Sequence, residues 1–129
     1  MKLIIFTLSF CLSFSALAKG KDCTDDSQFS DIPLTELQSL VSKNSATIID
    51  VNSKSSYTKN KIPGAIHFGT NKDQLAKVLP KDKNAMIVAY CGGPMCTAWK
   101  RAAKASCELG YTNIRHFSGG ISGWKPKAG

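Results

Sequence analysis

The feature that most constrains this chain is an apolar run, residues 85–90, that ends directly at Cys91. A Gly-Gly-Pro segment follows the cysteine, and a helical pattern begins near Thr97. This run predicts a central strand, and the order strand, tight loop, helix is typical of an α/β protein. A thiol at such a junction faces free backbone N–H groups and the positive end of a helix, which stabilise a thiolate or persulfide anion. The sequence therefore predicts a reactive sulfur at Cys91.

Apolar spacing elsewhere predicts helices alternating with short strands. Helices are expected over 35–43, around 75–79, and from Thr97 to the stop at Gly110. A capping box of Thr35 and Gln38 is predicted for the first helix, and Asn71 as the cap of the second. Strands are expected at 46–51, 85–90 and 113–117, and a turn with a short strand at 62–67. The alternation predicts an α/β fold with a parallel sheet, in which ligands bind beyond the carboxyl ends of strands.

The first eighteen residues resemble a secretory signal peptide rather than part of the domain. Lys2 gives a basic start, residues 3–18 carry no charge, and the run ends in Ala-Leu-Ala. The run is shorter than the about 20 residues that a membrane-spanning helix needs. We therefore expect residues 1–18 to be cleaved, leaving an exported protein, periplasmic or secreted, with no stable membrane anchor. Residues 19–30 are then a polar, flexible lead-in to a domain over 31–127.

The charge balance limits the partners of the chain. Without Lys2, sixteen Lys and Arg face nine Asp and Glu, a net charge of +7. Nearly all the cations are Lys and they are spread along the chain, whereas nucleic-acid binding favours clustered Arg with interleaved aromatic residues. We therefore expect no nucleic-acid partner, and a basic surface that attracts small anions.

Four cysteines remain after cleavage, and they allow three pairings into two disulfides. Cys96 is either a resolving thiol, which attacks a persulfide on Cys91 and leaves a disulfide, or a small residue that packs at the helix start. Cys23 and Cys107 either form a structural disulfide or stay unpaired. A Cys-x4-Cys spacing with no second pair or His cluster is poor for zinc, so no metal site is expected.

Four short segments occur in a specific order: I-I-D-V at 48–51, K-I-P-G-A-I-H at 61–67, Y-C-G-G-P-M-C at 90–96 and G-G-I-S-G-W at 119–124. Through these segments the chain resembles a single rhodanese domain, across roughly 29–125. The resemblance implies a rhodanese-like three-layer fold, with a central, mostly parallel sheet flanked by helices. It also implies a sulfurtransferase, similar to thiosulfate sulfurtransferases, that uses neither a metal nor an organic cofactor.

The resemblance assigns the catalytic role to Cys91, which takes a sulfane sulfur from a small anionic donor as a persulfide. The acceptor is a thiol or a cyanide-like nucleophile, and a protein thiol also fits this role. The backbone of the following loop cradles the persulfide, with N–H groups supplied by all but the proline: Gly92, Gly93, Pro94, Met95, Cys96 and Thr97. Lys100 and Arg101 are accessory candidates that raise the local positive potential.

Asp50 is a further accessory candidate, with two interpretations. Either it orients neighbouring loops or shapes the site entrance, or it only makes a local turn bond at the end of its strand. Asn52 stands where the family often has Arg, and the loop itself has neither Arg nor Lys, which leaves the donor open. Thr97 stands where a cysteine phosphatase needs a phosphate-clamping Arg, which argues against that activity. Two alternatives stay open: a thiol–disulfide redox protein that uses Cys91 and Cys96, and a non-catalytic binding module.

Overall fold

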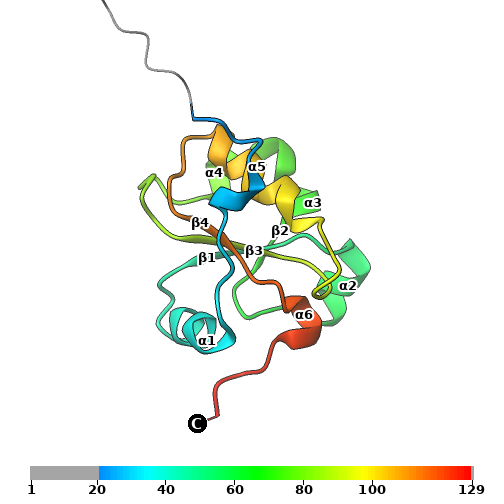
Figure 1. The fold of residues 1–129 in the computed structure, drawn as a ribbon. Helices are drawn as coiled ribbons and strands as arrows, with labels where there is room; N and C mark the ends of the chain where they lie inside the picture. Colours follow the sequence, from blue (N-terminus) through cyan, green and yellow to red (C-terminus); the bar gives the residue numbers. More distant parts are fainter. Residues whose placement is uncertain (1–20, 129) are drawn as a thin grey trace, which may run out of the picture.

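The computed structural model describes residues 21–128, so the predicted signal peptide lies outside the described residues. The centre of the fold is a four-stranded sheet in the order β2-β1-β3-β4 (Figure 1). Its strands are β1 (Thr47–Asp50), β2 (Ile66–His67), β3 (Ile87–Tyr90) and β4 (Ile114–His116). Every pairing of these strands is parallel, so their carboxyl ends share one edge of the sheet.

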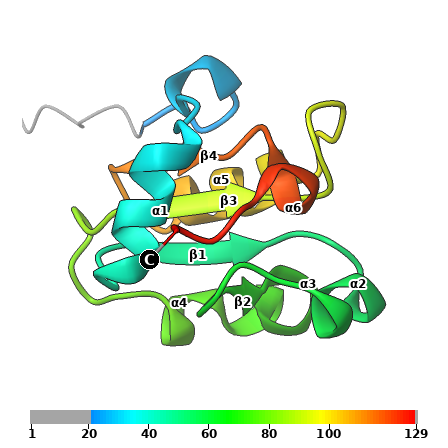
Figure 2. The same ribbon diagram turned by 90° about the horizontal axis from the view of Figure 1, so that it is seen from below.

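Helices cover both faces of this sheet. They are α1 (Leu34–Ser42), α2 (Lys54–Lys59), α3 (Phe68–Asn71), α4 (Leu75–Val78), α5 (Trp99–Glu108) and α6 (Gly120–Gly123), with 3₁₀ turns η1 (Asp26–Gln28) and η2 (Lys72–Gln74). In both ribbon views α1 and α6 lie on one side of the sheet and α5 on the other (Figures 1 and 2). The predicted α/β architecture of three layers is therefore confirmed.

The pleat of the strands divides the core into two clusters. Ile49, Ala89 and Cys91 pack on the face that α5 covers, together with the buried side of that helix. Val88 and Tyr90 point to the opposite face, against residues of α1 and α6. The strand predicted at 85–90 is confirmed as β3, and all four residues of β3 are fully buried. Alternation along β3 thus places Cys91 on the side of α5.

Two predicted helix caps are wrong. Helix α1 begins at Leu34 with Pro33 as its N-cap, so Thr35 lies inside the first turn and no side-chain cap bond forms. Gln38 instead donates from Nε2 to the carbonyl of Lys125 at 2.8 Å. The chain becomes helical directly after His67, whose ring caps α3, so Asn71 ends that helix and donates to the His67 carbonyl.

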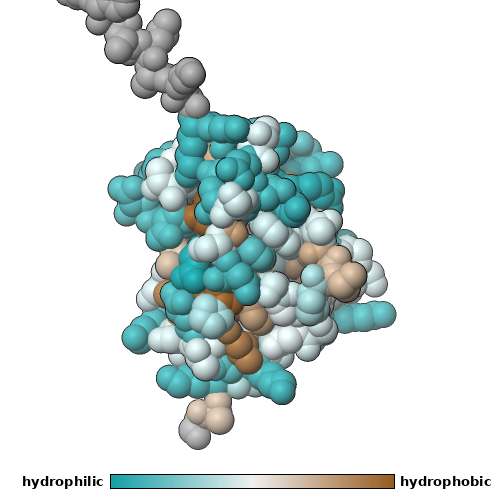
Figure 3. Space-filling model, in the orientation of Figure 1, coloured by the Kyte–Doolittle hydropathy of each residue, from teal (hydrophilic) through white to brown (hydrophobic). Residues whose placement is uncertain are grey.

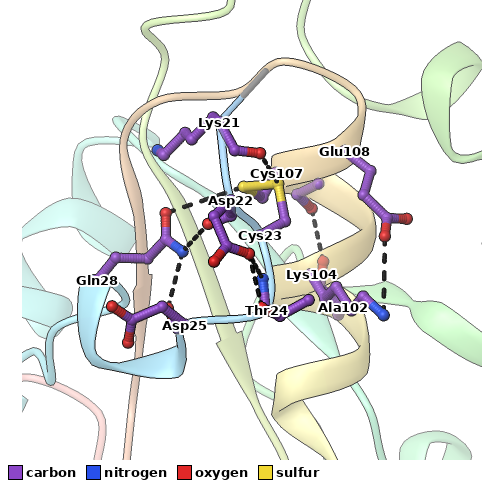
Figure 4. Close-up of a disulfide and its surroundings, with 11 residues drawn as sticks. Lys21, Asp22, Cys23, Thr24, Asp25, Gln28, Ala102, Lys104, Cys107 and Glu108 are labelled. Carbon is purple, nitrogen blue, oxygen red and sulfur yellow. Dashed lines mark hydrogen bonds and ion pairs between the residues drawn. A yellow bond between two sulfur atoms is a disulfide. The ribbon is translucent and has the colours of Figure 1, made fainter. Parts of the chain in front are cut away.

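The described part of the lead-in is packed against the domain, which differs from the flexible segment predicted for 19–30. Phe29 is buried, and Cys23 is bonded to Cys107 of α5. Figure 4 shows this disulfide beside the segment from Asp22 to Gln28, in which the side-chain amide of Gln28 donates to the carbonyls of Asp22 and Asp25. A covalent link and a buried aromatic ring fix a segment whose polar composition alone predicted mobility.

None of the helices within residues 21–128 is both long and apolar enough to cross a bilayer. The face of the molecule shown in Figure 3 is mostly hydrophilic, with a narrow hydrophobic strip between α1 and α6.

Candidate functional site

The candidate site lies where the order of the sheet changes direction. The chain passes from β1 outward to β2, and from β3 outward to β4 on the other side. Between β1 and β3 the loops that follow the two strands therefore diverge, which is where α/β sheets bind ligands. Cys91 directly follows β3, and Asp50 ends β1. The fold thus brings these two residues, forty-one positions apart in the chain, to one edge.

A tight turn returns the chain to Cys91. The N–H of Cys96 donates to the carbonyl of Gly93 at 3.0 Å, with Pro94 at the second position, where its fixed φ favours a turn. The Cα atoms of Cys91 and Cys96 lie 6.2 Å apart, and their sulfurs form a disulfide. Cys91 is only 2% exposed. The structure therefore represents the oxidised form of the site, in which neither sulfur is a free nucleophile.

The loop leaves some of the predicted cradle amides available and occupies others. The Cys96 N–H is engaged in the turn, and Pro94 has no N–H. Within residues 21–128, the N–H groups of Gly92, Gly93, Met95 and Thr97 donate to no protein acceptor. Helix α5 follows with no side-chain cap at its start, although the N–H groups of Lys100 and Arg101 already donate to the carbonyls of Thr97 and Ala98 at 3.0 and 3.1 Å. The unpaired amides of the loop are therefore the donors that can stabilise an anionic sulfur.

Helix α6 binds the backbone of the loop that begins at Cys91. The N–H groups of Ile121 and Ser122 donate to the carbonyls of Cys91 and Gly92 at 2.9 and 3.0 Å. Gly120 has a φ of +59°, and a Cβ there would lie 2.5 Å from the nitrogen of Gly93. The second Gly of the G-G-I-S-G-W segment is thus required for close backbone approach. Its supporting role was missed in the sequence, although the motif itself was recognised.

A buried polar network connects the site to the I-P-G-A segment. The N–H of Ile62 donates to the Tyr90 hydroxyl at 3.0 Å, and that hydroxyl donates to Asp50 Oδ2 at 2.5 Å. Burial, together with the hydrogen bond to Asp50, raises the pKa of Tyr90 above its ordinary value. Because Tyr90 directly precedes Cys91, this network fixes the end of β3.

Asp50 makes both kinds of contact that the sequence left open. Its Oδ1 accepts the N–H of Asn52 at 2.8 Å, a local turn bond, while Oδ2 binds Tyr90 across the strands. Asp50 is fully buried, so it orients the loop after β1 rather than lining an open entrance.

Asn52 lies next to the loop that follows Cys91. A Cβ on Gly92 would lie 3.7 Å from Asn52 Oδ1. The Nδ2 atom of Asn52 is buried and has no hydrogen-bond partner among the described residues. A neutral amide with an unused donor therefore stands next to the first glycine of the loop.

The two accessory cations lie on α5, and each has another contact. Lys100 Nζ lies 3.0 Å from Asp26 Oδ2, and Arg101 lies over the ring of Phe68 at 5.9 Å. The segment from Cys91 to Ala98 contains no charged residue. The local anion-binding groups are therefore backbone amides, and the charge of Lys100 is partly neutralised by Asp26.

Fold and site together define an α/β domain that presents a cysteine-containing loop at the carboxyl edge of a parallel sheet. A family model for the Rhodanese-like domain matches residues 33–127, and the chain belongs to this family. A search of curated proteins finds no match.

Solved structures show the same fold at low sequence identity. The reduced CoADR-RHD protein of Bacillus anthracis is 25% identical with a TM-score of 0.57; the match covers 74% of this chain but only 16% of that one. A human single-domain sulfurtransferase, TSTD1, is 22% identical with a TM-score of 0.58, over 73% of this chain and 93% of that one. The single-domain sulfurtransferase RDL2 of Saccharomyces cerevisiae is 17% identical with a TM-score of 0.59, over 74% and 88%. At these identities the human and yeast structures bear on the fold alone.

Proposed function

We propose that this protein is a sulfurtransferase that carries a sulfane sulfur as a persulfide on Cys91 and passes it to a thiophilic acceptor. The observation that carries the proposal is the position of Cys91. It follows a buried strand at the switch point of the sheet and is followed by glycines with unpaired amides and by the start of α5. The names of the human and yeast neighbours, both single-domain sulfurtransferases, are consistent with this chemistry.

The chemistry requires the site in its reduced form. Attack on a donor forms a bond between Cys91 Sγ and the sulfane sulfur, and the bond from that sulfur to the rest of the donor breaks. The product persulfide is anionic, so the free amides of Gly92 and Gly93 stabilise it without a metal or organic cofactor. Because the Cys91–Cys96 disulfide occupies the nucleophile, a thiol reductant must open it first.

The direct test is sulfur transfer to cyanide by the reduced full chain, measured as thiocyanate. Thiosulfate and inorganic tetrasulfide are compared as donors, because the uncharged loop leaves the donor class open. The wild type is expected to load and transfer sulfur, and Cys91→Ser to fall to the rate of the uncatalysed reaction. Transfer by Cys91→Ser at the rate of the wild type would overturn the proposal.

The disulfide itself favours one second candidate, thiol–disulfide exchange between Cys91–Cys96 and a protein thiol. This candidate predicts that the reduced protein is oxidised by a protein disulfide, and that the oxidised protein is reduced again by a protein dithiol, with no sulfane sulfur present. It also predicts that Cys91→Ser and Cys96→Ser abolish exchange equally. A Cys96→Ser variant that still forms thiocyanate separates sulfur transfer from exchange.

We also propose that the protein works in an oxidising compartment, the periplasm or the exterior of the cell. The apolar run with its Ala-Leu-Ala end supports export, and two disulfides in a small domain fit an oxidising compartment. Mass analysis of the protein recovered from its native host tests this proposal: the expected mature chain begins at Lys19. A chain that still begins at Met1 would overturn it.

A further inference from the structure

The loop brings the sulfurs of Cys91 and Cys96 together, whereas transfer of a sulfane sulfur to an external acceptor needs only the Cys91 sulfur. The Gly93–Cys96 turn returns the second cysteine to the first, and the two sulfurs are within bonding distance. A thiol held in this way competes with any acceptor in solution, because a well-oriented internal nucleophile has a very high effective concentration. A persulfide formed on Cys91 therefore faces Cys96 before it meets another molecule.

We propose that Cys96 resolves the Cys91 persulfide internally, so that the protein releases the sulfane sulfur as hydrogen sulfide and closes into the disulfide of this structure. This inference rests on the proposed function, since it begins from the persulfide. The Cys96 thiolate attacks Cys91 Sγ, and a bond forms between the two cysteine sulfurs. The bond from Cys91 Sγ to the outer sulfur breaks, and the outer sulfur keeps the electron pair, takes up the proton that the Cys96 thiol has lost, and leaves as hydrosulfide. The outer sulfur is reduced by two electrons, and the cysteine pair is oxidised by two.

The loop beside the cysteine pair is in contact with solvent. The amides of Gly92 and Gly93, which have no backbone acceptor among the described residues, can donate to a departing hydrosulfide as well as to the persulfide. Residues 94, 95 and 97 are exposed, so only a thin, uncharged loop separates the cysteine pair from solvent. Neither the stabilisation of the persulfide nor the departure of the hydrosulfide needs a positively charged side chain.

The cycle is completed by a protein dithiol, which reduces the disulfide. Cys91 is 2% exposed, whereas Cys96 is partly exposed, so an incoming thiolate reaches Cys96 Sγ first. Attack there gives a mixed disulfide on Cys96 and expels Cys91 as a thiolate, which the free loop amides stabilise. The second thiol of the partner then attacks the mixed disulfide, and Cys96 leaves as a thiol while the partner becomes a disulfide.

The surface around Cys96 fits such a partner. Met95 is 94% exposed beside it, next to the exposed Pro94, and no charged residue lies between Cys91 and Ala98. An apolar, uncharged tip is suited to backbone and apolar contacts with another protein. The other disulfide does not offer this arrangement, because Cys23 and Cys107 are both buried and lie in no such loop.

The test uses the full chain, reduced with dithiothreitol, desalted, loaded with inorganic tetrasulfide and desalted again. In the wild type we expect the added sulfur, about 32 Da, to disappear as free sulfide appears, leaving a chain about 2 Da lighter than the reduced one. Cys96→Ser is expected to keep its added sulfur at least about tenfold longer, because it lacks the internal nucleophile. Cys23→Ser/Cys107→Ser, assayed in the cold, is a matched control that removes the other pair and should release sulfide like the wild type.

The outcomes separate this inference from the proposed function. If the wild type holds its sulfur as long as Cys96→Ser, while both form thiocyanate with cyanide, internal resolution is overturned and sulfur transfer stands. If neither protein gains sulfur on Cys91, both proposals fall. Repeated release of sulfide should require stoichiometric dithiothreitol. During reduction by glutathione, quenching with iodoacetamide should place glutathione on Cys96 and the alkyl group on Cys91; the reverse pattern would overturn the proposed order of reduction.

Discussion

The two disulfides of this protein differ in almost every physical respect. Cys23–Cys107 joins residues 84 positions apart, ties the lead-in to α5, and is buried at both ends. Cys91–Cys96 spans only five positions, and one of its ends is partly exposed. The first bond links distant parts of the fold, whereas the second closes a loop that the Gly93–Cys96 turn already holds.

This difference has an energetic consequence. If a disulfide stabilises mainly by restricting the unfolded chain, the 84-residue separation contributes about 4 to 5 kcal/mol and the five-residue separation about 2 kcal/mol. The long link therefore matters chiefly for stability. The short link contributes less to stability and lies on the sulfur that the chemistry needs, so its opening is compatible with a folded domain.

The largest expected effect comes from removing the long link. Cys23→Ser/Cys107→Ser should lower the free energy of unfolding by about 4 kcal/mol, measured by urea denaturation with the short bond intact. Cys96→Ser, the corresponding test of the short link, should lower it by about 2 kcal/mol. If the two losses were equal, or their order reversed, the assignment of stability to the long link would be contradicted.

A second prediction compares two glycines, Gly120 next to the Cys91 loop and Gly110 near Cys107. Gly120→Ala should destabilise the protein by about 2 to 3 kcal/mol and slow sulfur transfer more than tenfold, since its Cβ would push against the nitrogen of Gly93. Thiocyanate formation and urea denaturation measure the two effects.

Gly110→Ala is the matched control for this change. Gly110 also has a positive φ, +96°, but a Cβ there meets nothing within 4 Å, and it lies near Cys107 rather than Cys91. We expect a modest loss of stability, about 1 kcal/mol, with sulfur transfer unchanged. A loss of transfer in Gly110→Ala equal to that in Gly120→Ala would show that general destabilisation, and not the loop contact, is responsible.

The third expected effect concerns the hydrogen-bond network of Tyr90 and Asp50, next to the short link. Tyr90→Phe leaves Ile62 N–H and Asp50 Oδ2 without their buried partner, which should cost about 1 to 3 kcal/mol. The long link should be unaffected, so the variant tests only the region of Cys91. Stability equal to the wild type would contradict the positioning role of the network.

The same variant has a pH signature. In the folded protein the raised pKa keeps the Tyr90 proton, while the unfolded chain releases it near its ordinary value of 10.0. The unfolded state then binds fewer protons, so wild-type stability should fall as pH rises above 10. The fall specific to Tyr90 should be missing in Tyr90→Phe when the two unfolding curves are compared at pH 9 to 11.

The sequence predicted the elements that depend on local pattern. The apolar run before Cys91 predicted a central strand, and β3 is that strand and is fully buried. The apolar face of α5 was equally readable from its spacing, because helical periodicity is a property of neighbouring residues. The helix caps were predicted less well, since Pro33 and the ring of His67 fix those helix starts in place of the residues whose types suggested caps.

The features around Cys91, at the end of β3, were determined partly by the sequence and partly by the tertiary structure. By itself the sequence determined that Cys91 follows a buried strand and precedes glycines and a helix, because those are consequences of order along the chain. Only the tertiary structure decided that Cys91 is bonded to Cys96, that α6 binds the loop backbone, and that Asp50 reaches Tyr90. The α6 and Asp50–Tyr90 contacts join residues far apart in the chain, so packing of the sheet and its helices had to bring them together, whereas the turn of the loop decided between the two roles that the sequence left open for Cys96.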